Sequence, residues 1–368
     1  MCQIVIPCEN GAGQWWPARK DVPVRALQLV SPGKIEIRDV PIPEIGPDEV
    51  LVRVAGAGLC HSDIHVLHTP EWPVPNMTLG HETSGWVEAM GADVTGFAEK
   101  DAVLVYLVWA CGVCRPCIEG RDNVCVNQGG RLGMPPCPGL GPDGGMAEFI
   151  KVKARYLEPL GDLDPVSAAP LADAGLTPMH AINGARHRLT PGSTAVVIAV
   201  GGLGHMGLQI LKETTGARII AVDSSDQKLE IAREHGADEI VKSDANSAKT
   251  ILDLTGGYGA DAVFDFVGVQ PTVSLATQVI APDGALRFVG LGGGGFEYAA
   301  DSATSTLPWG VDVRRSYGGT RSDQRQVLDL ARQGKISVDT VTYSLDDGLT
   351  AFADLEAGTV AGRAVLVP

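Results

Sequence analysis

Two hydrophobic patterns divide the chain near its middle. Over residues 24–107, short segments such as KIEIRDV (34–40) alternate apolar and polar residues and are separated by Pro and Gly. This pattern predicts half-buried strands, and many short strands with regular turns predict a barrel-like β domain. After residue 164, continuous apolar runs such as STAVVIAV (193–200) alternate with amphipathic helical segments. That order predicts parallel strands joined by right-handed helical crossovers.

These patterns predict an α/β chain with two domains. The predicted boundaries are an extension over 1–22, a β-rich catalytic domain over 23–170, a nucleotide-binding domain over 171–311 and a return to the catalytic domain over 312–368. The return is predicted because the chain ends in GRAVLVP, a short apolar strand. Trp15 and Trp16 lie in the extension, for which the sequence assigns no role.

Composition and charge narrow the function classes. Hydrophobic residues make up 45% and charged residues 20% of the 368 residues, as in ordinary globular proteins. The formal net charge of −15 disfavours nucleic acid and anionic membranes as partners. The sequence has no apolar run long enough to span a bilayer and no secretory signal, so a cytoplasmic protein is expected.

A glycine-rich turn predicts a dinucleotide site. In AVVIAVGGLGHMG (195–207), Gly201 would let a pyrophosphate approach the backbone, and Gly204 would let the following helix pack on the strand. Asp223 ends the next predicted strand, where a carboxylate binds ribose hydroxyls and repels a 2′-phosphate, so NAD is favoured over NADP. Ala199 stands where the fingerprint has its first glycine, and a negative φ is expected there. The alternative is a glycine-rich turn beside an unrelated surface aspartate.

Four cysteines predict a closed metal site. Their spacing is Cys-x2-Cys-x2-Cys-x7-Cys, at Cys111, Cys114, Cys117 and Cys125. Four thiolates fill a tetrahedral zinc and leave no open position, so this zinc would be structural. An iron–sulfur cluster or disulfides are the alternatives. Cys137 lies outside the spacing and is interpreted, with Cys2 and Cys8, as an ordinary thiol.

Three further groups could form an open metal site. They are Cys60, the neighbours His81 and Glu82, and Asp173. Each has a simpler interpretation by itself: a buried thiol, a structural histidine, a helix cap. Together they matter because a catalytic zinc takes three protein ligands and keeps a fourth position free.

The motifs GLCHSDIH (58–65), GHETSG (80–85) and DAGLT (173–177), the four-cysteine segment and the glycine turn occur in one order. In this order the chain resembles the medium-chain zinc-dependent alcohol dehydrogenases, with the greatest resemblance to bacterial members that act on secondary alcohols. The resemblance covers nearly everything after the first two dozen residues. It implies a GroES-like β-barrel catalytic domain and a Rossmann domain with a doubly wound parallel sheet.

The resemblance also assigns roles around the open metal site. It implies that Cys60, His81 and Asp173 bind a catalytic zinc. Glu82 would be a transient ligand or a neighbour of the metal, and Asp63 would orient the His81 ring.

Further roles concern the proton and the cofactor. The resemblance implies that Ser62 hydrogen-bonds the substrate oxygen and that His65 passes the proton outward. The implied cofactor-binding residues are His61, Thr177, Gly201, Gly202, Leu203, Gly204, Asp223, Lys228 and Arg363.

The resulting prediction is a dehydrogenase that transfers hydride reversibly between a primary or, preferably, a secondary alcohol and NAD, with two zinc ions per chain. The alternatives are a polyol, sugar or amino-alcohol dehydrogenase and, more remotely, a non-catalytic nucleotide-binding protein. The family resemblance implies a homotetramer or homodimer. The predicted cleft residues Trp109, Leu132, Leu291 and Tyr317 are largely apolar, which favours simple alcohols over polyols.

Overall fold

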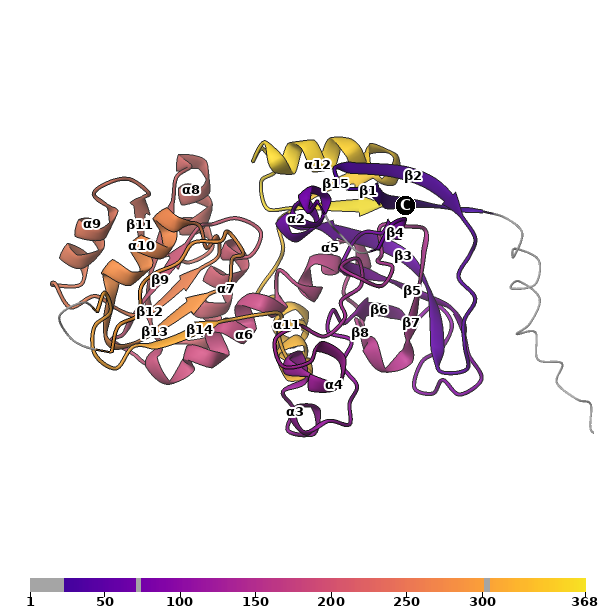
Figure 1. Cartoon of the computed structure of the whole chain (residues 1–368), viewed down its shortest axis with the longest axis horizontal. Coiled ribbons are helices and arrows are strands. Elements are labelled where there is room, and N and C mark those ends of the chain that lie inside the picture. Colours follow the sequence, from indigo (N-terminus) through magenta and orange to yellow (C-terminus); the bar gives the residue numbers. More distant parts are fainter. Residues whose placement is uncertain (1–22, 71–73, 301–304) are drawn as a thin grey trace, which may run out of the picture.

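The computed structural model describes residues 23–70, 74–300 and 305–368 of the chain. Two domains lie side by side, and a small lobe with the short helices α3 (Arg115–Ile118) and α4 (Val126–Gly129) projects from the first (Figure 1). No helix in the described part of the chain is both long and apolar enough to traverse a lipid bilayer. The predicted extension over 1–22 lies outside the described residues.

The second domain contains a six-stranded sheet in which every neighbouring pair is parallel. In spatial order its strands are β11 (Glu239–Lys242), β10 (Arg218–Asp223), β9 (Thr194–Ile198), β12 (Ala260–Asp265), β13 (Ile280–Phe288) and β14 (Asp312–Arg315). The chain order reverses between β9 and β12, which is the doubly wound arrangement. The predicted Rossmann sheet is therefore confirmed.

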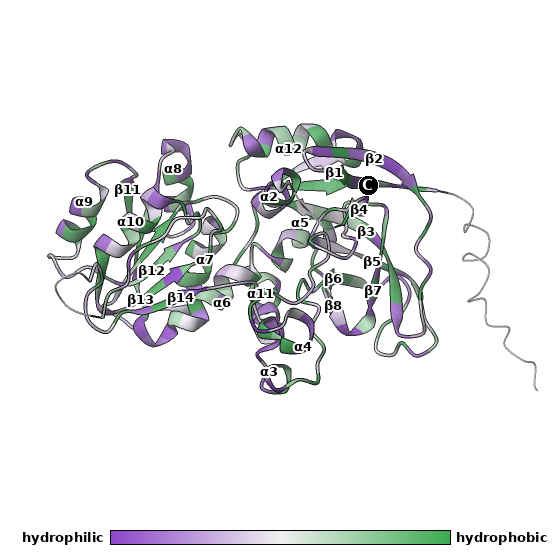
Figure 2. Ribbon diagram, viewed as in Figure 1, coloured by the Kyte–Doolittle hydropathy of each residue, from purple (hydrophilic) through white to green (hydrophobic). Residues whose placement is uncertain are grey.

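Helices cover both faces of this sheet, because alternate strand residues point to opposite sides. The helices are α6 (Leu176–Ala185), α7 (Gly204–Thr214), α8 (Asp226–Glu234), α9 (Ser247–Leu254) and α10 (Gln270–Val279), and α11 (Arg321–Arg332) packs against α6 and η3. Val197 of β9 is buried in one cluster with Ile182 of α6 and Leu208 of α7. Its neighbour Val196 is buried in another cluster with Ile251 of α9. Burial on both faces explains the continuous apolar strands seen in Figure 2.

The first domain is built from two mainly antiparallel sheets. The larger sheet has the order β15 (Thr340–Ser344), β16 (Arg363–Val367), β3 (Glu49–Leu59), β5 (Glu82–Met90), β6 (Ala102–Val105) and β8 (Leu157–Pro159), and β7 (Phe149–Lys153) also pairs with β3. The smaller sheet has the order β2 (Lys34–Val40), β1 (Val24–Ser31) and β4 (Met77–Thr78). The C-terminal strand β16 lies antiparallel to β3, so the tail of the chain completes the first domain.

Short helices connect these strands. The α-helices are α2 (His61–His68), α5 (Pro165–Ala168) and α12 (Gly348–Glu356). The 3₁₀ turns are η1 (Asp122–Val124), η2 (Ala154–Tyr156), η3 (Ala169–Ala172), η4 (Arg186–Arg188) and η5 (Leu345–Asp347). Helix α2 directly follows β3, and η3 directly precedes the segment that leads into α6.

One predicted boundary differs from the structure. The sequence places the end of the nucleotide-binding domain at residue 311, whereas β14 (Asp312–Arg315) pairs with β13 as the edge strand of that sheet. The sequence of β14 is DVRR, and none of its residues is fully buried. An edge strand has only one neighbouring strand, so it needs no apolar run and gives little sequence signal.

The expected negative φ at Ala199 is wrong. Ala199 follows β9 at the start of the glycine turn and has φ of +74°. The turn packs tightly, since a Cβ added to Gly204 would lie 1.8 Å from the Ala199 carbonyl oxygen. The passage from β9 into α7 therefore requires a left-handed residue at 199, and alanine occupies it at a cost of about 1–2 kcal/mol.

We expect Ala199→Gly to stabilise the protein. Relief of the left-handed strain outweighs the entropy that a glycine adds to the unfolded chain, so the free energy of unfolding should rise by about 0.5–1 kcal/mol. Thermal unfolding of the zinc-loaded protein measures this change. Ala195→Gly, at a buried position in β9, is the matched control and should lower stability. A similar loss in both variants would contradict the interpretation.

Candidate functional site

The three predicted ligands of the open metal site lie together. Cys60 follows β3, His81 precedes β5 and Asp173 follows η3. Their ligand atoms lie within 4.8 Å of one another. Asp173 Oδ2 is 3.6 Å from Cys60 Sγ and 3.5 Å from His81 Nε2. Three segments that are distant in sequence thus bring sulfur, nitrogen and oxygen ligands to one point.

The charges at this point suit a divalent cation. Burial alone would lower the pKa of His81, but the carboxylates of Asp63 and Asp173 outweigh it and hold that pKa well above its usual value. Burial alone would raise the pKa of Asp173, yet His81 and other partners lower it. The surrounding carboxylates therefore favour positive charge at this point, and a divalent metal ion would supply such a charge. A thiolate, an imidazole and a carboxylate are ordinary zinc ligands, so the residues present fit zinc.

Asp63 supports two of the ligands. Its Oδ2 accepts a hydrogen bond of 2.9 Å from the backbone N–H of Cys60. Its Oδ1 lies 3.5 Å from His81 Nδ1, and both of these buried atoms lack another hydrogen-bond partner. A small rotation of the ring would join them, which is the contact expected of a carboxylate that orients a metal-binding histidine.

Thr177 has a contact that the sequence did not reveal. Its Oγ1 donates a 2.5 Å hydrogen bond to Asp173 Oδ1, which leaves Oδ2 facing Cys60 and His81. The threonine stands four residues after the aspartate, at the start of α6. The family resemblance implies only a contact of Thr177 with the cofactor. The four-residue spacing between Asp173 and Thr177 at the start of a predicted helix could have indicated this hydrogen bond.

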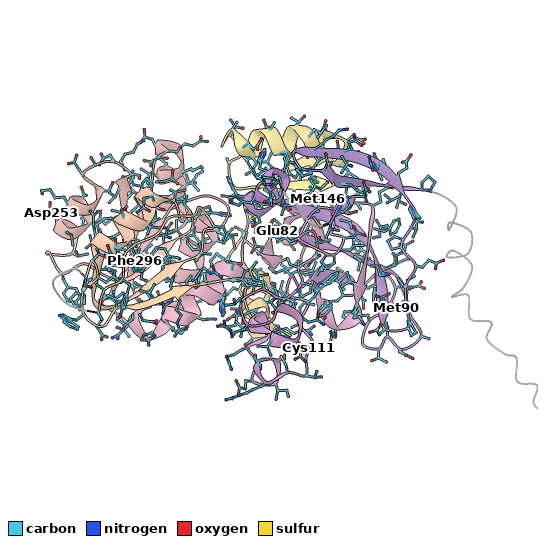
Figure 3. The ribbon with its side chains drawn as sticks, in the orientation of Figure 1. Glu82, Met90, Cys111, Met146, Asp253 and Phe296 are labelled. Carbon is cyan, nitrogen blue, oxygen red and sulfur yellow. The ribbon has the colours of Figure 1, made fainter. Side chains whose placement is uncertain are left out.

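Glu82 is not one of the three converging ligands, and its role as a transient ligand or a neighbour of the metal stays a prediction. Both of its carboxylate oxygens accept hydrogen bonds from Arg363, at 2.8 and 2.5 Å, and one also accepts from the backbone N–H of Ala174. Figure 3 shows Glu82 near the centre of the molecule, on the side of the first domain that faces the second. The sequence could not reveal this pair, because its members are 281 residues apart.

Arg363 connects the metal site to the glycine turn. Its Nη2 lies 3.4 Å from Asp173 Oδ2, and a Cβ added to Gly202 would lie 2.3 Å from its Nη1. Burial would lower its pKa, but the charges of Cys60 and Glu82 raise it well above the usual value. Arg363 is therefore a permanent buried cation directly beneath the turn.

The predicted dinucleotide residues also come together. Gly201, Gly202 and Leu203 form the turn that leads into α7, and Asp223 ends the adjacent strand β10. The Asp223 carboxylate accepts hydrogen bonds from the backbone N–H groups of Val200 (2.8 Å) and Ser225 (2.9 Å). Asp223 therefore fixes the turn as well as standing at the predicted ribose position.

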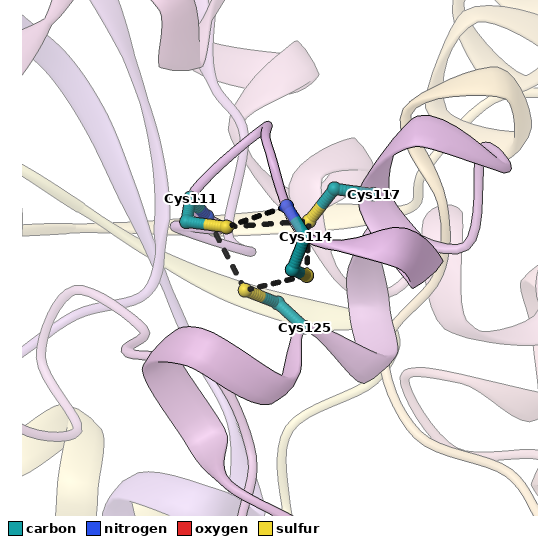
Figure 4. A group of neighbouring side chains, drawn as sticks. All are labelled: Cys111, Cys114, Cys117 and Cys125. Carbon is teal, nitrogen blue, oxygen red and sulfur yellow. Dashed lines mark hydrogen bonds between the residues drawn. The ribbon is translucent and has the colours of Figure 1, made fainter.

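The four cysteines of the lobe converge as predicted (Figure 4). Cys114 Sγ lies 3.4 Å from Cys117 Sγ and 3.7 Å from Cys125 Sγ, while the sulfurs of Cys111 and Cys117 are 3.9 Å apart. Burial opposes ionisation of Cys114, but hydrogen bonds from backbone N–H groups and from Cys117 lower its pKa to about 6. Four sulfurs at these distances fit a closed tetrahedral zinc site.

The predicted cleft residues lie in different places. Leu132 and Leu291 are 78% and 56% exposed, and Trp109 stacks on Tyr156 with ring centroids 5.4 Å apart. Tyr317 is half-buried. Its pKa is raised by burial first and then by charges that include Asp173 of the metal site.

Cys137, interpreted from the sequence as an ordinary thiol, is buried in one cluster with Leu176, which lies three residues after Asp173. Burial raises the pKa of Cys137 to about 12, while the charge of His81 opposes this rise and that of Asp173 adds to it. Prolines precede it and follow it in the sequence, and this context gave no signal of its position.

The two metal sites should respond differently to loss of one ligand. Because an open and a closed site each bind one zinc, Cys60→Ala should lower the content from about two to about one zinc per chain with little change in unfolding temperature. Cys114→Ala should also lose one zinc and clearly lower that temperature, since the metal holds the lobe together. Metal analysis with calorimetry checks both, and Cys137→Ala should keep both ions. Unfolding of Cys60→Ala would contradict the assignment.

Comparison with known proteins places this geometry in a family. The model of the alcohol dehydrogenase GroES-like domain matches residues 46–162, and that of the zinc-binding dehydrogenases matches 202–333. The chain is 36% identical to an NAD-dependent alcohol dehydrogenase of Sulfurisphaera tokodaii, over 94% of this chain and 100% of that protein. It is 35% identical to an NADP(+) D-arabinose 1-dehydrogenase of Saccharolobus solfataricus, over 91% and 94% of the two chains.

A solved structure agrees with these relatives. The alcohol dehydrogenase of the archaeon Aeropyrum pernix superimposes with a TM-score of 0.86 at 35% identity, covering 94% of this chain and 100% of that chain. The chain therefore belongs to the zinc-dependent medium-chain alcohol dehydrogenase family, as the order of its motifs predicted.

Proposed function

We propose that this chain oxidises alcohols, secondary alcohols in preference to primary ones, or reduces the matching carbonyl compounds, with NAD as cofactor. The observation that carries the proposal is the convergence of Cys60, His81 and Asp173 beside the glycine turn. When bound, zinc supplies a Lewis acid for an alcohol or carbonyl oxygen, and NAD supplies the hydride chemistry.

The charges of the chain's own residues support this chemistry. With zinc bound, Cys60 would be a thiolate, and it would then share a buried space with the carboxylates of Asp173 and Glu82, giving three negative charges. A divalent ion together with the Arg363 guanidinium balances them, so neither cation alone has to neutralise the site. Three ligands also leave one tetrahedral position for a substrate oxygen. The intact ligand set argues against a non-catalytic nucleotide-binding protein.

Helix α2 offers a route for the substrate proton. Ser62 is half-buried on its first turn, with Oγ 3.7 Å from Cys60 Sγ. We propose that Ser62 accepts a hydrogen bond from the substrate hydroxyl and that His65, exposed one turn later, releases the proton to solvent.

Asp223 supports NAD rather than NADP. Its carboxylate lies at the end of β10 beside the turn, where it would accept hydrogen bonds from ribose hydroxyls and repel a 2′-phosphate. Further proposed cofactor contacts come from residues around the turn, namely His61, Thr177, Leu203, Lys228 and Arg363.

Charge reversal beside the ribose tests this assignment. We expect Asp223→Asn with Ser224→Arg to raise the NADP-to-NAD ratio of kcat/KM by about 10- to 100-fold, because a repulsive carboxylate is replaced by a charged donor. Asparagine keeps an oxygen for the N–H of Val200. Asp226→Asn, which removes an exposed charge from α8, is the control and should leave the ratio unchanged. An unchanged ratio in the double variant would place the ribose elsewhere.

A sugar or polyol dehydrogenase remains the second candidate, favoured by the similarity to a D-arabinose dehydrogenase. The observation against it is the buried, mainly apolar cluster that contains Cys137 and Leu176, which lies three residues after Asp173, because apolar residues offer few hydrogen-bond partners to a polyol. We expect kcat/KM with NAD to be about tenfold or more higher for simple secondary alcohols than for pentoses and polyols. The opposite order would favour the second candidate. Absence of turnover by zinc-loaded protein that binds NAD would reject both.

We propose that the chain forms a homodimer or homotetramer through the edge of the nucleotide sheet. β14 ends this sheet, so its outer backbone groups are available for pairing with a second copy. Trp309, just before β14, is 77% exposed, and Tyr298 is 75% exposed. We also propose a cytoplasmic location, since the six cysteines in the described part of the chain are free thiols.

A further inference from the structure

The chain returns from α11 to the first domain through residues 333–339. Ile336 in this segment is buried in one cluster with Leu208 and Leu211 of α7. Tyr343, on the strand β15 that follows, packs against the core of the first domain. The segment therefore leads from a contact with α7, the helix that follows the glycine turn, to the sheet that contains β16.

A buried glutamine of α7 fixes the backbone of this segment. Gln209 Nε2 donates to the Ser337 carbonyl oxygen at 2.9 Å, and the Ser337 N–H donates to Gln209 Oε1 at 2.9 Å. Gln209 is 8% exposed, because the segment covers it. An amide that pairs with both the N–H and the C=O of one residue sets the orientation of that backbone as well as its position.

A second contact lies two residues further along the segment. His235 directly follows α8, and its Nε2 is 2.8 Å from Asp339 Oδ2. The His235 ring also lies beside that of His205 on α7, with ring centroids 5.7 Å apart. His205 Nδ1 is in turn 3.1 Å from the Gly201 carbonyl oxygen of the glycine turn. Residues 337–339 are thus held by α7 and by the end of α8.

Asp339 connects the segment to Arg363. The Asp339 carbonyl oxygen accepts a 2.8 Å hydrogen bond from the backbone N–H of Arg363. Thr340 and Arg363 are partners in the parallel pairing of β15 with β16. A Cβ added to Gly362 would lie 2.1 Å from the Asp339 carbonyl oxygen, so the two backbones are in close contact. The position of Asp339 therefore determines where the Arg363 backbone lies.

These contacts form a closed ring. The glycine turn leads into α7, α7 holds residues 337–339, these hold the backbone of Arg363, and the Arg363 guanidinium lies against Gly202 of the turn. The arginine belongs to the first domain and the turn to the second, so the distance between them depends on how the domains are joined. Glu82 fixes the guanidinium within the first domain, whereas Gln209 fixes it relative to the turn.

We infer that Gln209 and His235 are positioning residues for cofactor binding. Acting through Ser337 and Asp339, they hold the Arg363 guanidinium at the distance from the glycine turn at which it binds the pyrophosphate of NAD. We call these four residues, Gln209, His235, Ser337 and Asp339, the α7 clamp. The inference rests on the proposed function, in which Arg363 is a cofactor contact. Because coupling is reciprocal, a ligand that engages both the turn and Arg363 should also stabilise the clamp.

The test compares two ligands that need no turnover. ADP-ribose contains the pyrophosphate, whereas AMP has one phosphate, and both carry the adenosine ribose expected at Asp223. Each is titrated calorimetrically into the zinc-loaded protein. Gln209→Met keeps the length of the side chain but removes both hydrogen bonds, so the preference for ADP-ribose over AMP should fall about three- to tenfold. Equal weakening of both ligands, or an unchanged preference, overturns the inference.

The histidine has a conservative variant that should restore binding. His235→Phe keeps a ring but loses the nitrogen beside Asp339, and it should lower the same preference about threefold. His235→Gln can still donate to Asp339 and should keep the preference near that of the wild type. Equal preferences in the two variants would mean that the ring only fills space, and would remove His235 from the clamp.

A matched control lies on the same helix and the same segment. Glu213 of α7 is 3.7 Å from Lys335 Nζ in a partly exposed ion pair, before the residues that contact β16. Such pairs contribute little, so Glu213→Gln should leave the preference unchanged. A fall as large as that in Gln209→Met would show that any loosening of the segment has the same effect, and would overturn the specific role of Gln209.

Hydrogen exchange measures the reciprocal effect. The Ser337 amide donates to Gln209, so its exchange reports opening of the clamp. In the wild type, ADP-ribose should slow exchange in peptides that cover 333–340 more than AMP does at equal saturation. Gln209→Met should abolish this difference. Equal protection by both ligands in the wild type overturns the coupling.

Kinetics separate this inference from the proposed function. Gln209→Met should raise KM for NAD about threefold or more without lowering kcat, since no reacting group is removed. A fall in kcat with unchanged KM would overturn the positioning role. A changed ligand preference without alcohol turnover in the wild type would support the clamp and reject alcohol oxidation. Alcohol turnover with an unchanged preference in Gln209→Met would support alcohol oxidation and reject the clamp.

Discussion

The guanidinium of Arg363 is buried among the carboxylates of Glu82 and Asp173, and its Nη1 lies against Gly202 of the glycine turn. A buried cation costs several kcal/mol in lost hydration unless anions and hydrogen bonds offset the loss. Glu82 offsets it with both oxygens, so Arg363 can contact the metal site and the turn at the same time. Because Arg363 begins β16, this arrangement forms only when the C-terminal tail pairs with β3. The discontinuous first domain is thus a requirement of the site, and one cation sets the spacing between the metal and the dinucleotide positions.

Much of the fold could be predicted because its causes are local. The alternation in segments such as 34–40 and the apolar run at 194–198 follow from whether one or both faces of a strand are buried. The four cysteines share one short lobe, so their spacing alone indicates a metal site. The open site is different, because spacing cannot bring Cys60 and Asp173 together across 113 residues. Only the resemblance of ordered motifs to a known family supplied that prediction.

The features that the sequence did not predict depend on tertiary context. The identity of residue 199 is visible in the sequence, but its positive φ is imposed by the close approach of its carbonyl to Gly204. The pairing of Glu82 with Arg363 depends on the register of β16 against β3, which no local pattern encodes. β14 is polar because it is an edge strand, so the pattern that identified its neighbours is absent there. In each case, a distant segment determines the local structure.

The two metal sites of the first domain differ in coordination, and this difference gives them different roles. In a closed site all four positions are taken by the protein, so the binding energy of the metal goes into fixing the chain. The lobe has few apolar residues of its own, and Ile118 and Val113 are 75% and 71% exposed. Its order must therefore come from the four cysteines rather than from a core. A turn held by metal ligands on both sides is a rigid base for Asp122 and Asn123, and these residues hold the segment that links β14 to α11. Rigidity created at the closed site in this way extends to the segment that connects the nucleotide sheet with α11.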